Sequence, residues 1–116
     1  MRFKKMSYQH MLYLLSIGKY AADPDTGAIY NKHNRLLKPF HRPDQQHLFV
    51  RLFDHELSSS IGVGRLVWMS VTKEVIPNGW QIHHRDEDPS NNAWNNLLCL
   101  HPLDHLKIHD KQPIPF

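Results

Sequence analysis

The chain has a single cysteine, Cys99, among its 116 residues. One thiol excludes an intramolecular disulfide and any zinc ribbon built from paired Cys-x-x-Cys knuckles. If the protein holds a metal ion, its ligands must therefore be His, Asp, Glu or Asn side chains.

Long apolar runs are missing as well, and none approaches the roughly 18 residues that a membrane-crossing helix needs. Basic residues precede the apolar stretch 11–17, which is the order found in a signal peptide. That stretch is short, however, includes Tyr13 and follows the polar residues 7–10. We therefore expect one compact, soluble, cytoplasmic protein with no membrane partner.

Charge is distributed unevenly along the chain. Residues 1–52 carry nine Lys or Arg against three Asp or Glu, whereas residues 53–116 carry five against eight. This asymmetry suits a polyanion-binding front half joined to an acidic segment that attracts a metal ion. A solvated charged face is the alternative.

Local patterns in the front part predict one helix and two short strands. Ser7 is suited to cap a helix that runs to about Ala22, before the turn signals of residues 23–27. Residues 28–31 and 35–38 are then expected to pair as a hairpin.

The middle of the chain predicts a strand followed by a helix. Apolar residues alternate over 47–53, which indicates a strand with one buried face. Residues 58–63 fit either a strand or a loop. A helix is expected from Gly64 to about Lys73, with Arg65 turned toward solvent.

The last third predicts two strands and a helix. The strands are expected at 80–84 and 97–100, with the polar loop 85–93 between them. A short helix should run from about Pro102, because the N–H that proline lacks is unbonded at a first helical position anyway. It should end near Asp110.

Histidines are concentrated in this last third, where five of the ten lie between positions 83 and 109. On the expected final helix, His105 and His109 are four residues apart, so both imidazoles lie on one face and can bind one ion. His83 and His84 are neighbours on a strand and point to opposite faces. One of them can enter a metal cluster while the other faces elsewhere.

The polar residues of this segment form an ordered series: His83-His84, Asn91-Asn92, Asn96-Leu97, His105 and His109. The series resembles the signature of the HNH, or ββα-metal, nucleases. Residues 23–30 and 64–67 are similar to the leading region of phage-type and homing HNH endonucleases, so the resemblance covers about residues 20–110. For a phage-encoded member, the compartment would be the cytoplasm of the host cell.

The resemblance implies an α+β fold in one compact unit. Residues 1–75 would form a basic helix and hairpin region that positions DNA, and residues 76–116 the ββα-metal (His-Me finger) motif. It implies that His84 is the general base and that Asn96 orients the loop beside it. The implied ligands of one divalent metal ion are His83, His105 and, as a third, His109.

These implied roles have a physical basis. A neutral imidazole can take a proton from water near neutral pH, which suits His84. The family pattern often has Asp at the position of His83 and Asn at that of His105. Ligation by imidazoles alone favours Zn, Mn, Ni or Co over Mg, so the identity of the ion stays open among these five.

Double-stranded DNA is the expected partner. The cations expected to contact phosphate groups are Arg35, Lys38, Arg51 and Arg85. A side chain that only faces solvent is the alternative for Arg85. One site of this kind cuts one strand, so a monomer should nick DNA, whereas a double-strand break would need a homodimer or two binding events.

Other polar residues are expected to be structural. Asn92 should help to hold the loop, the acidic run 86–88 should be solvated, and His101 should cap the last helix or face solvent. Two other functions stay open. One is a DNA-binding protein that does not cleave, with the histidines as a structural zinc site, and the other is a nuclease for RNA or single strands.

Overall fold

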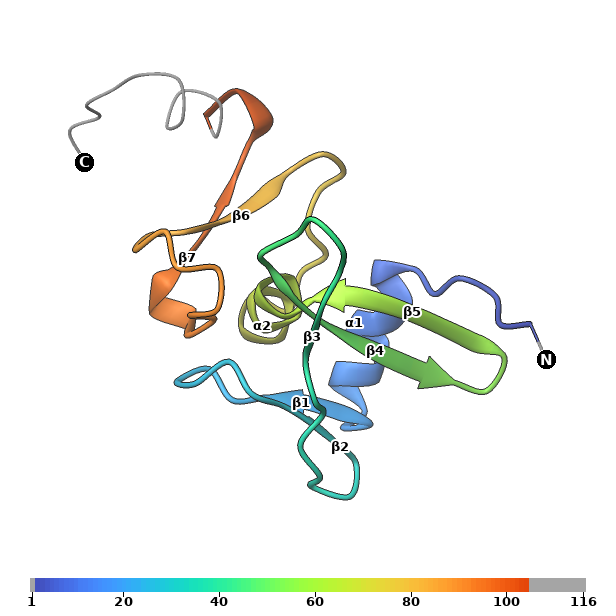
Figure 1. The fold of residues 1–116 in the computed structure, drawn as a ribbon. Coiled ribbons are helices and arrows are strands. Elements are labelled where there is room, and N and C mark those ends of the chain that lie inside the picture. The colour runs from blue at the N-terminus through green and yellow to red at the C-terminus, as the bar shows by residue number, and fades with distance from the viewer. Residues whose placement is uncertain (1, 105–116) are drawn as a thin grey trace.

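Three small antiparallel sheets and helix α1 surround helix α2 (Val63–Thr72) in the computed structural model, which describes residues 2–104 (Figure 1). The core contains side chains from α1, α2 and the strands, with Leu14, Leu52 and Leu66 fully buried. The α+β class predicted from the sequence is confirmed. No helix of the described part has the length and apolar character needed to cross a membrane.

Helix α1 (Tyr8–Ser16) begins as predicted, because the Ser7 hydroxyl accepts a hydrogen bond from the backbone N–H of His10 at 3.1 Å. Its predicted continuation to Ala22 is wrong. The backbone turns at Gly18, with φ at 79°, a left-handed conformation that ends many helices. Strand β1 (Tyr20–Ala22) therefore starts where a further helical turn was expected.

Strand β1 pairs with β2 (Ile29–Asn31), with Ala21 opposite Tyr30. The predicted hairpin between residues 28–31 and 35–38 is reduced to one bridge, between Tyr30 and Leu36. The partner strand of β2 is thus β1, whose residues were predicted to be helical.

The second sheet has the order β3 (Phe40–His41), β4 (Leu48–Asp54) and β5 (Leu57–Gly62). The predicted alternation in β4 is confirmed, because Val50 and Leu52 are buried while the residues between and after them are exposed. The apolar face of this sheet packs against α2.

Helix α2 lies close to its predicted position, and Leu66 and Val67 are buried as expected. The predicted orientation of Arg65 toward solvent is wrong. Its side chain is half-buried, and Nη2 donates a hydrogen bond of 3.3 Å to the carbonyl oxygen of Trp80. The segment entering the last sheet passes beside the first turn of α2, so the guanidinium meets a carbonyl instead of water.

The third sheet consists of the two strands predicted in this region, β6 (Gln81–His84) and β7 (Leu97–Leu100), which pair antiparallel, with the short 3-10 helix η1 (Trp94–Asn96) before β7. Residues 102–104 are helical. The N–H of Leu103 donates to Nδ1 of His101 at 3.1 Å, which is the predicted capping role. The rest of the predicted final helix, with His105 and His109, lies outside the described residues.

Candidate active site

His84 ends strand β6 in the interior of the protein, with 6% of its surface exposed. Its Nε2 lies 2.8 Å from Oδ1 of Asn92, which is buried too. An amide oxygen can only accept, so this hydrogen bond puts the hydrogen on Nε2 and leaves the lone pair on Nδ1. The contact thereby selects one tautomer and one orientation of the ring. The sequence predicts a loop-holding role for Asn92 and gives no signal for its contact with His84.

Two glycines allow the backbone to approach this pair. A Cβ at Gly27 would lie 2.6 Å from the Cβ of Asn92, and one at Gly64 would lie 3.0 Å from Oδ1 of Asn92 and 3.5 Å from Nε2 of His84. Contacts under about 3 Å force neighbouring atoms to move. The loop before β2 therefore packs closely against Asn92, and the first turn of α2 packs closely against both Asn92 and His84.

Asn96 holds the loop between the two strands. Its Oδ1 accepts from the backbone N–H of Asp86 at 3.1 Å, and its Nδ2 donates to the Asp86 carboxylate at 2.9 Å and to the Asn91 carbonyl at 2.8 Å. The backbone carbonyl of Asn96 accepts from the N–H of Arg85 at 2.8 Å. This is the loop-holding arrangement expected of a buried amide.

The carboxylate of Asp86 belongs to the same loop network. The amide of Asn91, 2.7 Å away, holds the pKa of Asp86 below its ordinary value, and the N–H of Asp88 and the Asn96 amide act in the same direction. Hydrogen bonds within the loop thus satisfy this carboxylate. Residues 86–88 are exposed, as expected of a solvated run.

His83 precedes His84 on β6, and the alternation of a strand directs the two side chains apart. His83 is half-buried and lines, with Glu87, a cavity of about 250 Å³. Residues 2–104 contain no group of three or more His, Cys, Asp or Glu that could hold a metal ion. One imidazole donor beside a carboxylate fits a divalent transition metal in its chemistry. The other two predicted ligands lie beyond residue 104.

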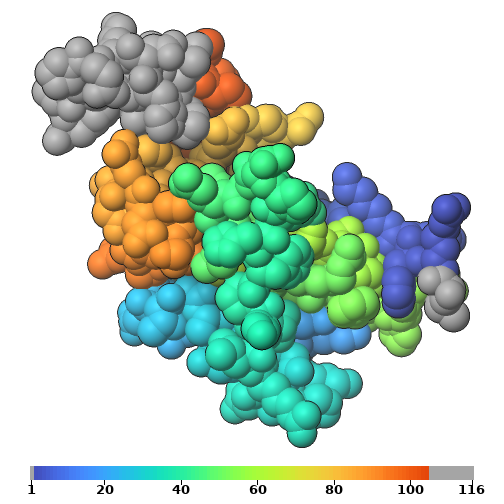
Figure 2. Space-filling model, viewed as in Figure 1, coloured from blue at the N-terminus to red at the C-terminus, as the bar shows by residue number. Residues whose placement is uncertain are grey.

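A histidine that the sequence analysis did not single out approaches His84 from the segment before β4. The ring centres of His47 and His84 are 5.4 Å apart, and both residues line a cavity of about 130 Å³ together with Arg65. In Figure 2 the segment before β4 lies against the loop that follows β6. Although His47 is exposed, partial desolvation of its ring lowers the pKa of His47, and the neighbouring His84 ring and Arg65 guanidinium act in the same direction. The spacing of positions 47 and 84 in the chain gives no signal for this contact.

A basic groove of about 830 Å³ runs along β4 and β5, and none of its described lining residues is acidic. Its cationic lining residues are Lys5, Arg42, Arg51 and Arg65. The guanidinium of Arg42 lies 4.4 Å from the ring centre of Phe49, and Nη1 of Arg51 donates to the Ser58 hydroxyl at 2.9 Å. We call this feature the basic groove.

The four cations predicted to contact phosphate lie in different places in the fold. Arg51 lines the basic groove, whereas Arg35, Lys38 and Arg85 are exposed and do not line it. Arg65 lines both the basic groove and the small cavity at His84. The position of Arg65 in both linings was not predicted, because helical periodicity alone places this residue on the solvent side.

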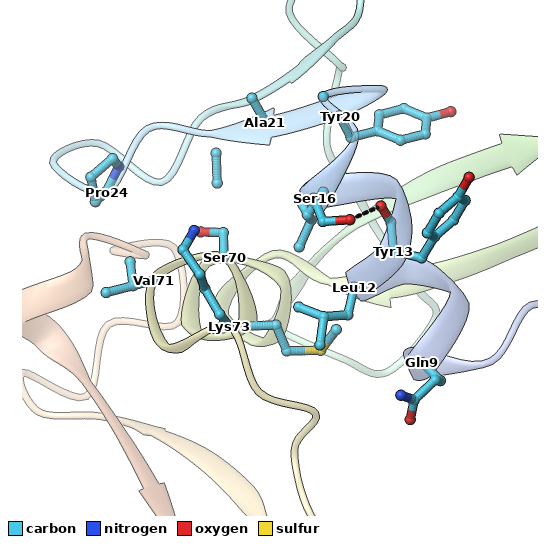
Figure 3. A pocket seen from close by; sticks show the side chains of 14 residues that line it. Gln9, Leu12, Tyr13, Ser16, Tyr20, Ala21, Pro24, Ser70, Val71 and Lys73 are labelled. Carbon is cyan, nitrogen blue, oxygen red and sulfur yellow. Dashed lines mark hydrogen bonds between the residues drawn. The ribbon is translucent and has the colours of Figure 1, made fainter.

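A further groove of about 720 Å³ lies between α1, β1 and the end of α2 (Figure 3). None of its described lining residues is His, Cys, Asp or Glu, and Lys73 is the charged one. Proton transfer and metal binding therefore have their candidate residues at the His84 end of the molecule.

Comparisons with known proteins point to the same region. The profile of the HNH endonuclease family matches residues 62–107. A solved structure described as "DNA binding and cleavage by the HNH homing endonuclease I-HmuI" is similar over 78% of this chain, with a TM-score of 0.63 and 25% identity. This chain covers 51% of that one and so spans about half its length. No curated protein sequence gives a match.

Proposed function

We propose that this chain, which belongs through residues 62–107 to the HNH endonuclease family, is a metal-dependent endonuclease that hydrolyses phosphodiester bonds in double-stranded DNA. The buried pair of His84 and Asn92 is the observation that carries the proposal. A histidine held in one tautomer by an amide, beside a small cavity that shares Arg65 with a groove lined by cations, suits a general base that acts on a polyanion.

In the proposed reaction, Nδ1 of His84 takes the proton from the attacking water. The bond from Nε2 to Asn92 persists when the ring becomes positively charged, so the amide dipole stabilises the imidazolium. The water oxygen forms a bond to phosphorus as the bond to the 3′ oxygen breaks, and that oxygen takes a proton from solvent water while His84 returns its proton to solvent. The products carry 5′-phosphate and 3′-hydroxyl ends.

The metal ligands proposed are His83, His105 and His109. A divalent ion, when bound there, supplies positive charge against the negative charge that develops on the phosphate and on the leaving oxygen. Asn96 holds the loop that connects β6 to β7, and it thereby keeps His83 and His84 in register with β7. Imidazole donors favour Zn, Mn, Ni or Co over Mg.

DNA is proposed to lie along the basic groove, so that residues 1–75 position the duplex and residues 76–116 carry the chemistry. Arg51 contacts phosphate within the groove, and the exposed cations Arg35, Lys38 and Arg85 contact flanking phosphates. These contacts carry no base specificity by themselves. A monomer nicks one strand, and a homodimer cuts both.

The test is cleavage of supercoiled plasmid by the purified chain, in EDTA and with Mg, Mn, Zn, Ni or Co in turn. His84→Ala is compared with His33→Ala, which removes an exposed histidine from a turn after β2. We expect the wild type and His33→Ala to nick or linearise the plasmid with at least one metal, and His84→Ala to lose about 100-fold or more in rate. If the wild type binds DNA but does not cleave it with any of these metals, the proposed nuclease activity is refuted and a DNA-binding protein that does not cleave is supported.

A further inference from the structure

We propose that Arg65 and His47 form a phosphate-binding pocket beside His84, which holds the phosphodiester group that the activated water attacks. This inference rests on the proposed function and names substrate contacts for the same site. It assigns roles to one residue expected to face solvent and to one that local sequence patterns did not single out.

Arg65 is a half-buried cation that lacks a counter-ion in the described structure. Within residues 2–104, no ion pair joins it to a carboxylate. Within the described part of the chain its side chain makes one hydrogen bond, to the carbonyl oxygen of Trp80, and that bond is long at 3.3 Å. A guanidinium has five N–H donors, and a partly desolvated charge is costly unless it is paired. A bound anion would satisfy both requirements.

The position of Arg65 identifies where such an anion would lie. Arg65, His47 and His84 line the same cavity of about 130 Å³, and none of its described lining residues is acidic. The ring centres of the two histidines are 5.4 Å apart. The side chains of Arg65, His47 and His84 thus line one small space, and the first two are hydrogen-bond donors not used by the general-base mechanism.

The cavity also adjoins the path proposed for DNA. Arg65, Phe49 and Gly62 line both the basic groove and the cavity. A DNA strand that follows the groove would therefore meet Arg65, which also lines the cavity at His84. Arginine suits this position, because its planar fork can donate two parallel hydrogen bonds to one phosphate.

His47 complements Arg65 as a neutral donor. The residue is exposed, but partial desolvation of its ring lowers the pKa of His47, and the neighbouring His84 and Arg65 lower it further, which favours the uncharged ring. A neutral ring can donate one N–H to a phosphate oxygen without repelling His84 once that residue has accepted a proton. His47 is thus suited to orient the phosphate and Arg65 to bind it.

The first experiment measures binding of a short DNA duplex by fluorescence anisotropy, in EDTA, over a range of salt concentrations. Arg65→Gln should weaken binding and reduce the slope of log affinity against log salt by about one, the change expected for one lost phosphate contact. Lys73→Gln, which removes an exposed positive charge at the other end of the same helix, is the matched control. It should leave the slope unchanged.

The second experiment measures cleavage by the same variants with the best metal. Arg65→Gln and His47→Gln should each lower kcat by about 10- to 100-fold, as expected for lost contacts that stabilise the transition state. Arg65→Lys keeps the charge and should retain the salt slope, but it should lose kcat because the fork is gone. Thermal unfolding of each variant verifies that it is folded.

The two readouts separate this inference from the proposed function. A wild type that never cleaves, with a reduced salt slope for Arg65→Gln, would refute the nuclease and leave the phosphate contact supported. A cleaving wild type whose folded Arg65→Gln and His47→Gln variants keep its salt slope and kcat would refute the pocket.

Discussion

Asn92 accepts a hydrogen bond of 2.8 Å from Nε2 of His84, and both side chains are almost completely buried. This relationship predicts that Asn92→Ala lowers kcat for DNA cleavage by about 10- to 100-fold, because the imidazole loses the partner that fixes its tautomer. Plasmid nicking rates measure the effect. Nitrogen NMR of the His84 ring should show that the hydrogen no longer resides on Nε2 alone.

The matched control for this variant is Asn95→Ala, which removes an exposed amide from η1. Its nicking rate should equal that of the wild type. A nicking rate for Asn92→Ala that also equals the wild-type rate would show that His84 needs no orienting partner.

The two glycines beside Asn92 should separate stability from activity. Gly27→Ala should destabilise the fold by about 1–3 kcal/mol, because the new methyl would lie within 2.8 Å of backbone atoms and φ is 79°. Gly64→Ala gains helix propensity but presses on the Asn92 amide at 3.0 Å. We expect little change in its stability and a clear loss of nicking. Denaturant unfolding and plasmid assays on both variants measure this contrast, which equal losses of stability would refute.

Loss of the Asn96 side chain should loosen the loop between β6 and β7. Asn96→Ala leaves the N–H of Asp86 and the carbonyl of Asn91 without these bonds, at a cost of about 1–3 kcal/mol. The pKa of Asp86 should rise toward its ordinary value, because one hydrogen bond to its charged form is lost. Carboxyl NMR titration measures the shift. Asn91→Ala should raise that pKa more, and the opposite order would contradict this account.

Stability in acid should depend on Asp54, which joins α1 and the start of β1 to β4. Lys19 donates to its carboxylate at 2.6 Å and His10 at 2.7 Å, and they lower the pKa of Asp54 from 3.8 to about 2. A carboxyl whose pKa falls on folding stabilises the native state above its unfolded pKa, and this contribution is lost as the pH falls through the folded value. Asp54→Asn should therefore be less stable than the wild type above about pH 4.

The difference between Asp54→Asn and the wild type should close as the pH falls from about 4 to 2. Chemical unfolding at a series of pH values measures it. Glu74→Gln, which changes an exposed carboxylate, should follow the wild type throughout. A difference that stays constant down to pH 2 would mean that the ion pairs do not set the pKa of Asp54.

The elements predicted well are those whose signal is local. The alternation in β4 and the turn signals around β6 and β7 specify which residues are extended, and neighbouring positions on a strand must face apart. His83 and His84 were therefore placed correctly on one strand of a hairpin before any tertiary contact was known.

The contacts missed are those between segments distant in the chain. The helical pattern of α1 continues past Gly18, but pairing with β2 makes the next residues a strand. Asn92 and Asn96 are both asparagines of the segment between β6 and β7, and local sequence does not tell them apart. Their different partners depend on how α2 packs against the hairpin. The approach of His47 to His84 likewise depends on the assembled sheets.

The segment that matches the family begins at residue 62, yet the surroundings of its buried histidine come partly from earlier in the chain. Gly27 abuts Asn92, and the carbonyl of Pro24 accepts the N–H of Trp94 at 2.7 Å. A graft of the hairpin onto another scaffold would lose both supports together with His47. Residues 62–107 alone therefore lack contacts that support the site. A transfer of the site to another protein would have to include the loop that carries Pro24 and Gly27.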